Sequence, residues 1–163
     1  MIDKEEEKLY ELLDSLGIKY VRYEHKPVYT VEEADNLDID IPGQHCKNLF
    51  LRNKKGNIHY LVLADSKKYI DLKALSKEIG SSGLSFASEE RLKKYLGLKT
   101  GAVSPFGLIN DVEKQVIVLI DKGLTDKDLV NFHPNVNTAT IGLSYRDLEK
   151  FIKWHGNKYV YID

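Results

Sequence analysis

The chain has 163 residues, of which 42% are hydrophobic, and 24 basic residues against 25 acidic ones give a formal net charge of −1. These totals predict one soluble globular domain over residues 1–163 with a substantial core, and they argue against a protein that wraps long DNA. The acidic start and the lack of a long apolar run favour a cytoplasmic protein that does not cross a membrane. One cysteine excludes an internal disulfide and a four-thiolate zinc site.

The first elements are predicted from capping residues and hydrophobic spacing. Asp3, with Glu6 three residues later, predicts the start of a helix, and Gly17 predicts its end. Between them one helical face carries four leucines, Leu9, Leu12, Leu13 and Leu16. Residues 18–24 alternate loosely, as an edge strand does. Thr30 begins a second, shorter helix that turns Val31, Ala34 and Leu37 inward.

The middle of the chain predicts a hairpin followed by two capped helices. Segments 49–52 and 58–64 flank a polar, glycine-containing loop, which is the pattern of a β-hairpin. Asp71 caps a helix that ends at Gly80 and buries Leu72, Leu75 and Ile79. Ser88 caps the next helix, with Glu89 and Glu90 favourably placed in its first turn.

The last part of the chain alternates strands and a helix. The apolar run 116–120 predicts a central strand, and residues 138–141 predict a further strand. Ser144 starts a helix that buries Leu148, Phe151 and Ile152, and residues 159–162 close the chain as a strand. Helices and strands interleave irregularly, so the predicted fold class is α+β with a mixed sheet.

Three separate signals suggest chemistry, and each also has a simpler structural explanation. Lys47 places a cation at the start of an apolar strand, where a solvated strand-end lysine is the simpler reading. The small-residue run 101–107 leaves backbone N–H groups open to an anion or oxyanion, although a turn that packs Phe106 would look the same. His133 lies in a turn before a strand and needs no function there.

Other catalytic and metal-binding patterns are missing from the sequence. The five histidines share no metal-ligand spacing, and there is no P-loop, dinucleotide-binding turn or serine nucleophile elbow. Cys46 follows His45, but neighbours on a strand point to opposite faces, so we expect a buried and inert cysteine. The sequence predicts no metal and no cofactor.

Taken together and in order, these motifs resemble the YbaK/ProX-like aminoacyl-tRNA deacylase family, which is also found as the editing domain of bacterial prolyl-tRNA synthetases. The resemblance covers nearly the whole chain and is carried by residues 25–34, 47–51, 71–75, 101–107, 133–135 and 137–140. It implies a mixed, mostly antiparallel sheet or partial barrel flanked by helices. Cys46, where a threonine is expected, and Ala102, where serine is common, depart from the family pattern.

The resemblance also implies the roles of individual residues. Lys47 is implied to be essential, as a cation that holds the phosphate of the terminal adenosine or the reacting ester. The backbone around Gly101 and Ala102 is implied to be the oxyanion loop. A ribose hydroxyl of the tRNA would help to activate water, so no side-chain base is needed. Four further residues are expected to bind substrate, namely Asn48, Ser104, Pro105 and His133.

The predicted function is therefore trans-editing, the hydrolysis of mischarged alanyl-tRNA(Pro). In an apolar pocket, one methylene of difference between two amino acids gives about 1–3 kcal/mol of discrimination, so rejection of a larger amino acid is sterically feasible. Two alternatives stay open: a cysteinyl-tRNA(Pro) deacylase, and a non-catalytic module that binds tRNA or a synthetase. The expected partners are the acceptor end of tRNA(Pro) and, as a second candidate, prolyl-tRNA synthetase, with neither DNA nor membrane. No oligomeric state is predicted.

Overall fold

The computed structural model describes residues 2–27 and 40–163, and the helix predicted to begin at Thr30 lies outside the described residues. The helices are Lys4–Ser15 (α1), Leu72–Ile79 (α3), Glu89–Leu96 (α4) and Tyr145–His155 (α5), with 3-10 turns at Pro105–Asn110 (η1) and Lys122–Leu124 (η2). The strands are Val21–Glu24 (β1), Gln44–Arg52 (β2), His59–Asp65 (β3), Ser85–Phe86 (β4), Val116–Asp121 (β5), Val130–Phe132 (β6), Ala139–Leu143 (β7) and Tyr159–Ile162 (β8).

The four predicted helix starts that lie in the described residues are confirmed. The side chains of Asp3, Asp71, Ser88 and Ser144 each accept a hydrogen bond from a backbone amide of the first turn of their helix. Such caps satisfy amides that have no partner inside the helix, and each typically contributes about 1 kcal/mol. Gly80 ends α3 with a φ of 70°, the left-handed conformation that glycine adopts without strain.

Eight strands form one open sheet in the described part of the chain, in the order β1-β7-β6-β2-β3-β5-β8, with β4 paired to β2. Four of these pairings are antiparallel and three are parallel (β2–β6, β3–β5 and β5–β8). The predicted mixed sheet and α+β class are confirmed, and the sheet is open instead of forming a closed barrel. The apolar run at 116–120 is a central strand as predicted, since β5 has a neighbour on each side.

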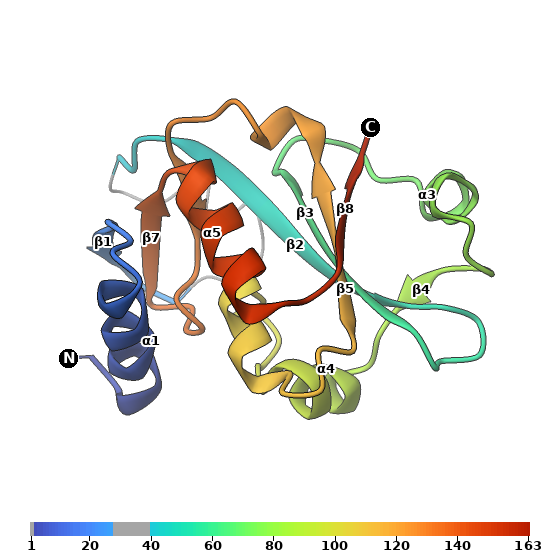
Figure 1. The fold of residues 1–163 in the computed structure, drawn as a ribbon, viewed down its shortest axis with the longest axis horizontal. Helices are drawn as coiled ribbons and strands as arrows, with labels where there is room; N and C mark the ends of the chain where they lie inside the picture. The colour runs from blue at the N-terminus through green and yellow to red at the C-terminus, as the bar shows by residue number, and fades with distance from the viewer. Residues whose placement is uncertain (1, 28–39) are drawn as a thin grey trace.

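Alternate side chains of the sheet belong to two separate hydrophobic clusters, one on each face. Leu61 and Leu63 pack in the larger cluster, with residues of α1, α4, η1 and α5. Tyr60, Val62 and Ala64 pack in the smaller one, with Leu75 of α3. The period of two in β3 therefore decides which helices cover which face, and Figure 1 shows α3 at the opposite end of the molecule from α1.

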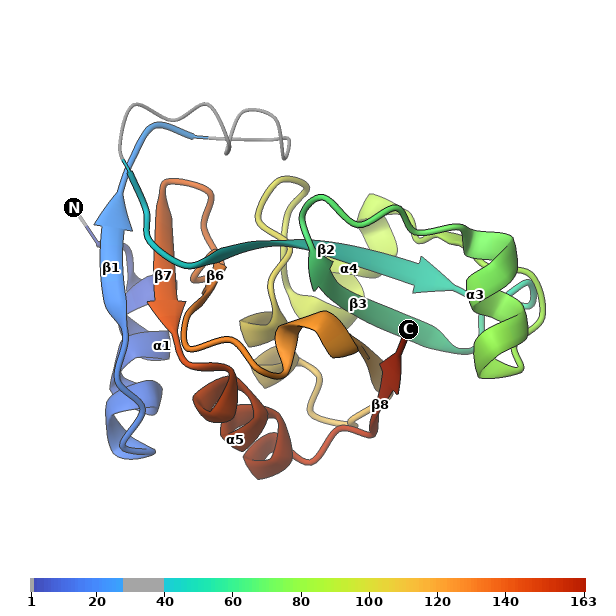
Figure 2. The same cartoon turned by 90° about the horizontal axis from the view of Figure 1, so that it is seen from above.

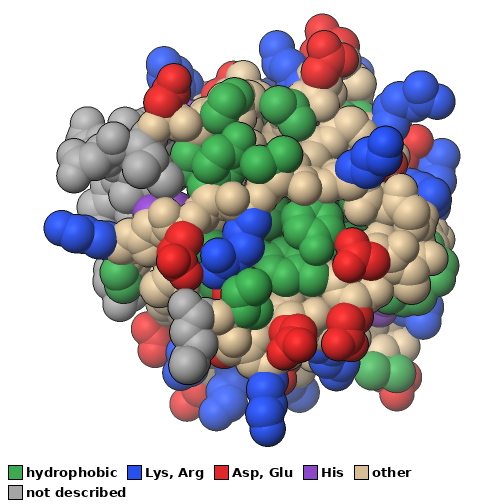
Figure 3. All heavy atoms as spheres, turned by 90° about the vertical axis from the view of Figure 1, so that its left-hand side faces the viewer, with side chains coloured by type: hydrophobic (Ala, Val, Ile, Leu, Met, Phe, Trp, Pro, Cys, Tyr) green, Lys and Arg blue, Asp and Glu red, His purple; other side chains and the backbone are tan. Residues whose placement is uncertain are grey.

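The first helix is attached to β1 by a buried acidic side chain. Glu6, which is 1% exposed, accepts hydrogen bonds of 2.5 Å from Arg22 Nε and from the Tyr10 hydroxyl. The Asp3 half of the predicted capping box is confirmed, while the Glu6 carboxylate turns to Arg22. On this side of the molecule, basic and acidic side chains are interspersed around hydrophobic ones (Figure 3), so neither sign of charge dominates it.

Gly107 lies where η1 packs against the residues that end α4, and we expect substitution there to destabilise the fold. A Cβ at this position would lie 2.6 Å from Leu98 Cδ1 and 3.1 Å from Leu96 Cβ. Gly107→Ala should therefore lower the free energy of unfolding by about 1–3 kcal/mol, measured by urea denaturation. Gly83→Ala is the control, because a Cβ there meets nothing within 4 Å. Equal midpoints for the two variants would contradict this expectation.

Candidate active site

The predicted cation is located where one edge of β2 has no strand partner among the described residues. The edge of β2 that faces away from β3 is paired by β6 at Gln44 and His45 and by β4 at Leu51 and Arg52. Among the described residues no strand pairs with this edge along residues 47–49. Among the described strands, only β3 therefore holds the backbone of this segment.

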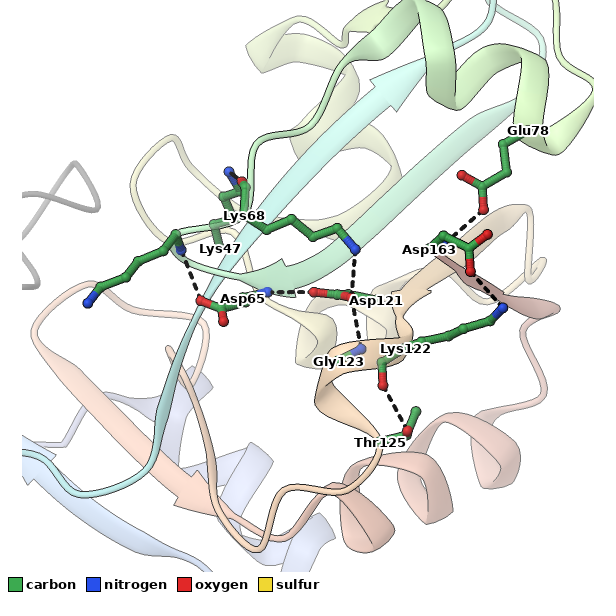
Figure 4. A network of polar contacts seen from close by, with 10 residues as sticks. Lys47, Asp65, Lys68, Glu78, Asp121, Lys122, Gly123, Thr125 and Asp163 are labelled. Carbon is green, nitrogen blue, oxygen red and sulfur yellow. Dashed lines mark hydrogen bonds and ion pairs between the residues drawn. The ribbon is translucent and has the colours of Figure 1, made fainter.

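Lys47 lies at the start of this segment, and its partner is a neutral group. Lys47 pairs with Ala64 of β3, is half-buried, and donates a hydrogen bond from Nζ to the carbonyl oxygen of Lys68 (Figure 4). No carboxylate of the described residues lies within ion-pair distance of this ammonium. An ammonium has three N–H donors, so two have no acceptor among the described residues, and no described carboxylate neutralises its charge.

Asn48 points to the opposite face of β2 from Lys47, because neighbouring side chains alternate along a strand. Phe50, two residues further on, belongs to the larger hydrophobic cluster. The Asn48 side-chain oxygen Oδ1 is buried and accepts no hydrogen bond from any described residue. An unsatisfied buried oxygen costs about 1–3 kcal/mol, so this position is suited to accepting a donor from a ligand.

The turn around Gly101 follows α4 and presents a backbone amide. Gly101 has a φ of 90°, and the amide of Ala102 donates to the carbonyl of Lys99 at 3.0 Å. The amide of Gly101 has no acceptor among the described residues. In Figure 2 this turn (yellow) and the turn after β3 (green) both lie on the upper side of the view. The turn that contains Gly101 is therefore on the same side of the molecule as the turn that follows β3.

Ser104 and Pro105 form the start of η1. Ser104 is fully buried, and its Oγ accepts a hydrogen bond of 3.0 Å from the amide of Phe106. Pro105 is buried at the first position of η1, where its missing N–H is not needed. Both residues have a structural role here, because they fix the end of the Gly101 turn. Their predicted contact with substrate stays a prediction.

The side chain of His133 is neutral near pH 7. Its Nδ1 lies 3.0 Å from the carbonyl oxygen of Ala139, and because a carbonyl only accepts, Nδ1 carries the proton and Nε2 is an acceptor. Burial lowers the pKa of His133, and the nearby His25 lowers it further, against the opposite effect of the bond to Ala139. The His25 ring lies 6.2 Å away, and its own Nε2 is bonded to Thr140 Oγ1 at 2.8 Å.

Cys46 has the environment of an inert thiol. Its side chain packs against the larger hydrophobic cluster, and its Sγ donates to the carbonyl of Gln44 at 3.4 Å. Burial raises the pKa of the Cys46 thiol to about 12. Very little thiolate is present near pH 7, and the thiolate is the nucleophilic form. A thiol-based mechanism is therefore disfavoured.

We expect Cys46 to resist alkylation in the folded protein. Iodoacetamide at pH 7.5 should leave intact protein unmodified by mass spectrometry, and the same treatment in denaturant should add one group, because unfolding removes the burial that raises the pKa. Cys46→Ala should retain wild-type deacylation. Rapid alkylation of the folded chain, together with an inactive Cys46→Ala protein, would mean that the thiol takes part in the reaction.

Other kinds of site are not apparent in the part of the chain that the structure describes. No group of three or more histidine, cysteine, aspartate or glutamate residues there could hold a metal ion. No described helix is long and apolar enough to cross a membrane. Two surface hollows of about 730 and 370 Å³ lie along α5, and neither contains a predicted site residue.

Comparisons with known proteins identify the family. The model of the aminoacyl-tRNA editing domain matches residues 25–151. The chain belongs to this family. It is 54% identical over 151 residues to the prolyl-tRNA editing protein ProX of Acetoanaerobium sticklandii, which covers 93% of this chain and 92% of that protein. It is 34% identical over 154 residues to the prolyl-tRNA synthetase associated domain-containing protein 1 of Mus musculus, covering 92% and 90%.

A solved structure shares the fold of this editing-domain protein. A crystal structure provisionally assigned as a trans-editing enzyme for prolyl-tRNA synthetase superposes with a TM-score of 0.69 at 20% identity, covering 98% of this chain and 97% of that one. The predicted family and fold class are confirmed. The predicted class of activity is also confirmed. The protein is an aminoacyl-tRNA deacylase, a hydrolase whose substrate is a charged tRNA.

Proposed function

We propose that this deacylase acts in trans on mischarged alanyl-tRNA(Pro), with Lys47 as the cation that holds the substrate at its reacting end. The observation that carries this proposal is the environment of the Lys47 ammonium, which is half-buried and bonded only to a neutral carbonyl among the described residues. A cation without a carboxylate partner attracts an anion more strongly, particularly where solvent is reduced. Phosphate and the developing oxyanion of an ester are both such anions.

The amide of Gly101 supplies the second interaction with the oxyanion. It has no acceptor among the described residues, whereas the amide of Ala102 is already bonded to Lys99. The proposal therefore assigns the donor to Gly101, and assigns Ala102 to holding the turn. Preorganised donors of this kind are typically worth about 2.7–4 kcal/mol of barrier, because they stabilise charge that develops only in the transition state.

The reaction itself needs no enzyme nucleophile. A water oxygen attacks the ester carbonyl carbon, and the negative charge that develops on the carbonyl oxygen faces Lys47 and Gly101. The bond between that carbon and the ribose oxygen then breaks, and the ribose oxygen takes up the proton lost by the water. A neighbouring ribose hydroxyl relays this proton in the proposed mechanism. The products are alanine and uncharged tRNA.

His133 and Asn48 fit the recognition of polar groups on the substrate. The neutral His133 ring presents Nε2 as an acceptor, which suits a ribose hydroxyl or the α-ammonium of the amino acid. The buried Oδ1 of Asn48 lacks a donor among the described residues. Binding a substrate that supplies this donor relieves the cost of one unsatisfied buried acceptor.

The choice of tRNA(Pro) rests on similarity to the ProX protein, which is named for editing prolyl-tRNA. The prolyl-tRNA synthetase itself is proposed as a second partner on the same basis. The acceptor end of tRNA is single-stranded, and its terminal phosphates suit the Lys47 ammonium, which no described carboxylate pairs with.

The test is to measure deacylation of alanyl-, cysteinyl- and prolyl-tRNA(Pro) side by side, at one enzyme concentration and one salt concentration. We expect alanyl-tRNA(Pro) to be hydrolysed fastest and prolyl-tRNA(Pro) to be spared. Faster hydrolysis of cysteinyl-tRNA(Pro) would mean that the preferred substrate carries cysteine and not alanine. A lack of turnover on all three, with retained binding to uncharged tRNA, would mean that this chain is a binding module.

A further inference from the structure

The carbonyl that holds Lys47 belongs to a turn that is fixed at several points. The amide of Lys68 donates to the carbonyl of Asp65 at 3.0 Å, and the amide of Lys67 donates to Asp65 Oδ1 at 3.0 Å. The amide of Ser66 donates to the carbonyl of His45 on β2 at 2.9 Å. The turn after β3 is thus closed on itself and tied to the strand that carries Lys47.

The same turn is anchored from its other end by an ion pair. Lys68 Nζ lies 2.8 Å from Oδ1 of Asp121, the last residue of β5, and the aspartate side chain is 5% exposed (Figure 4). One residue, Lys68, therefore uses its main-chain oxygen to hold Lys47 and its side chain to reach Asp121. These two contacts link the candidate active site to the end of β5, because Asp121 lies 53 positions after Lys68 in the chain.

Both carboxylate oxygens of Asp121 accept hydrogen bonds in this arrangement. Its Oδ1 also accepts from the amide of Gly123 at 2.9 Å, and its Oδ2 accepts from the amide of Asp65 at 3.1 Å. Burial raises the pKa of the Asp121 carboxyl, but the Lys68 ammonium and the two amides lower it more, so the pKa lies below its usual value. The carboxylate therefore stays charged at neutral pH. Charge-assisted bonds of this kind are stronger and more directional than neutral ones.

We propose that the Lys68–Asp121 ion pair is a positioning device for Lys47, which sets the place of its ammonium by fixing the carbonyl of Lys68. This inference rests on the proposed role of Lys47 in the reaction. Neither Lys68 nor Asp121 needs to touch the substrate. Breaking the pair releases the side chain that anchors the turn, and the carbonyl and the ammonium bonded to it then move together. Displacing a catalytic group by about 1 Å can reduce a rate by about a hundredfold.

The test compares Lys68→Met with Lys122→Met. The first variant removes the ion pair and keeps the backbone carbonyl that Lys47 uses. The second removes a neighbouring pair, Lys122 with Asp163 at 2.7 Å, whose side chains are 61% and 78% exposed. We expect Lys68→Met to lower kcat on alanyl-tRNA(Pro) by about tenfold to hundredfold with little change in KM. Lys122→Met should leave both unchanged, and Lys68→Arg should restore most of kcat.

A double variant separates positioning from a general loss of stability. If Lys68 acts through Lys47, then Lys68→Met should have no further effect in a Lys47→Ala background, whereas an independent role would multiply the two losses. Wild-type kcat in Lys68→Met, or a raised KM with kcat unchanged, would overturn the proposal. The thermal unfolding midpoint of each variant shows that the assay is carried out on folded protein.

The outcomes also distinguish this inference from the proposed function. An inactive Lys47→Ala protein together with a fully active Lys68→Met protein would reject the positioning device and leave the role of Lys47 intact. An active Lys47→Ala protein would reject both.

Discussion

Replacing Lys47 with alanine is expected to reduce deacylation of alanyl-tRNA(Pro) by about 10²–10³-fold while the protein stays folded. The ammonium is the proposed contact to developing negative charge, and no carboxylate of the described residues pairs with it and neutralises its charge. Loss of a preorganised charge in a site with limited solvent is costly because water replaces it only weakly. The measurement is kcat and KM with purified mischarged tRNA.

Two further variants control this experiment. Lys19→Ala removes an exposed lysine between α1 and β1 and should leave kcat unchanged. Lys47→Arg keeps the positive charge but moves it and spreads it over a planar group, so we expect an intermediate rate. If Lys47→Ala and Lys19→Ala hydrolysed the substrate equally fast, the assigned role of Lys47 would be wrong.

Truncating Phe106 is expected to have the largest effect on stability, about 3–5 kcal/mol in the free energy of unfolding for Phe106→Ala. This ring is fully buried and packs edge-on against Phe132 and Phe151, at centroid distances of 6.4 and 5.2 Å. Its removal leaves a cavity between η1, β6 and α5 that the surrounding backbone can close only in part. Urea denaturation measures the change directly.

The matched control for Phe106 is Phe86, the same residue type at the surface. Phe86 is 63% exposed on the short strand β4, and Phe86→Ala should change the free energy of unfolding by no more than about 0.5 kcal/mol. Similar losses in the two phenylalanine variants would mean that η1 is not part of the core. This pair of variants also tests the local structure of the candidate site, because Phe106 anchors the segment that follows the Gly101 turn.

Features that depend on a few adjacent residues could be predicted from the sequence. The four helix caps and the end of α3 at Gly80 depend on contacts within about five residues, and so does the turn that starts the hairpin of β2 and β3, where Asn53 bonds to Gly56 and Ile58. All are confirmed. The order of the family motifs also led to the correct family. Cys46 was predicted to be buried and inert. Its side chain is half-buried, and the raised pKa of its thiol supports the inert character.

Features that depend on distant partners could not be predicted in the same way. The short strands β4 and β6 have only two and three residues, so they carry no readable period. β4 is defined by its pairing with β2, and β6 by its pairing with both β2 and β7. The run 101–107 has neither a helical nor a strand period, and most of its second half forms the 3-10 turn η1. Glu6 was expected to complete a capping box, but Arg22 on β1 binds its carboxylate.

For the candidate site, the sequence alone determined which residue types are present and in what order: a strand-end lysine, a glycine turn and a turn histidine. The tertiary structure decided what each of them contacts. It gave Lys47 a neutral carbonyl partner, bonded the amide of Ala102 but gave that of Gly101 no acceptor among the described residues, and joined Lys68 to Asp121. Local patterns record conformational preference, whereas the charge and hydrogen bonds at a site depend on residues that only folding brings together.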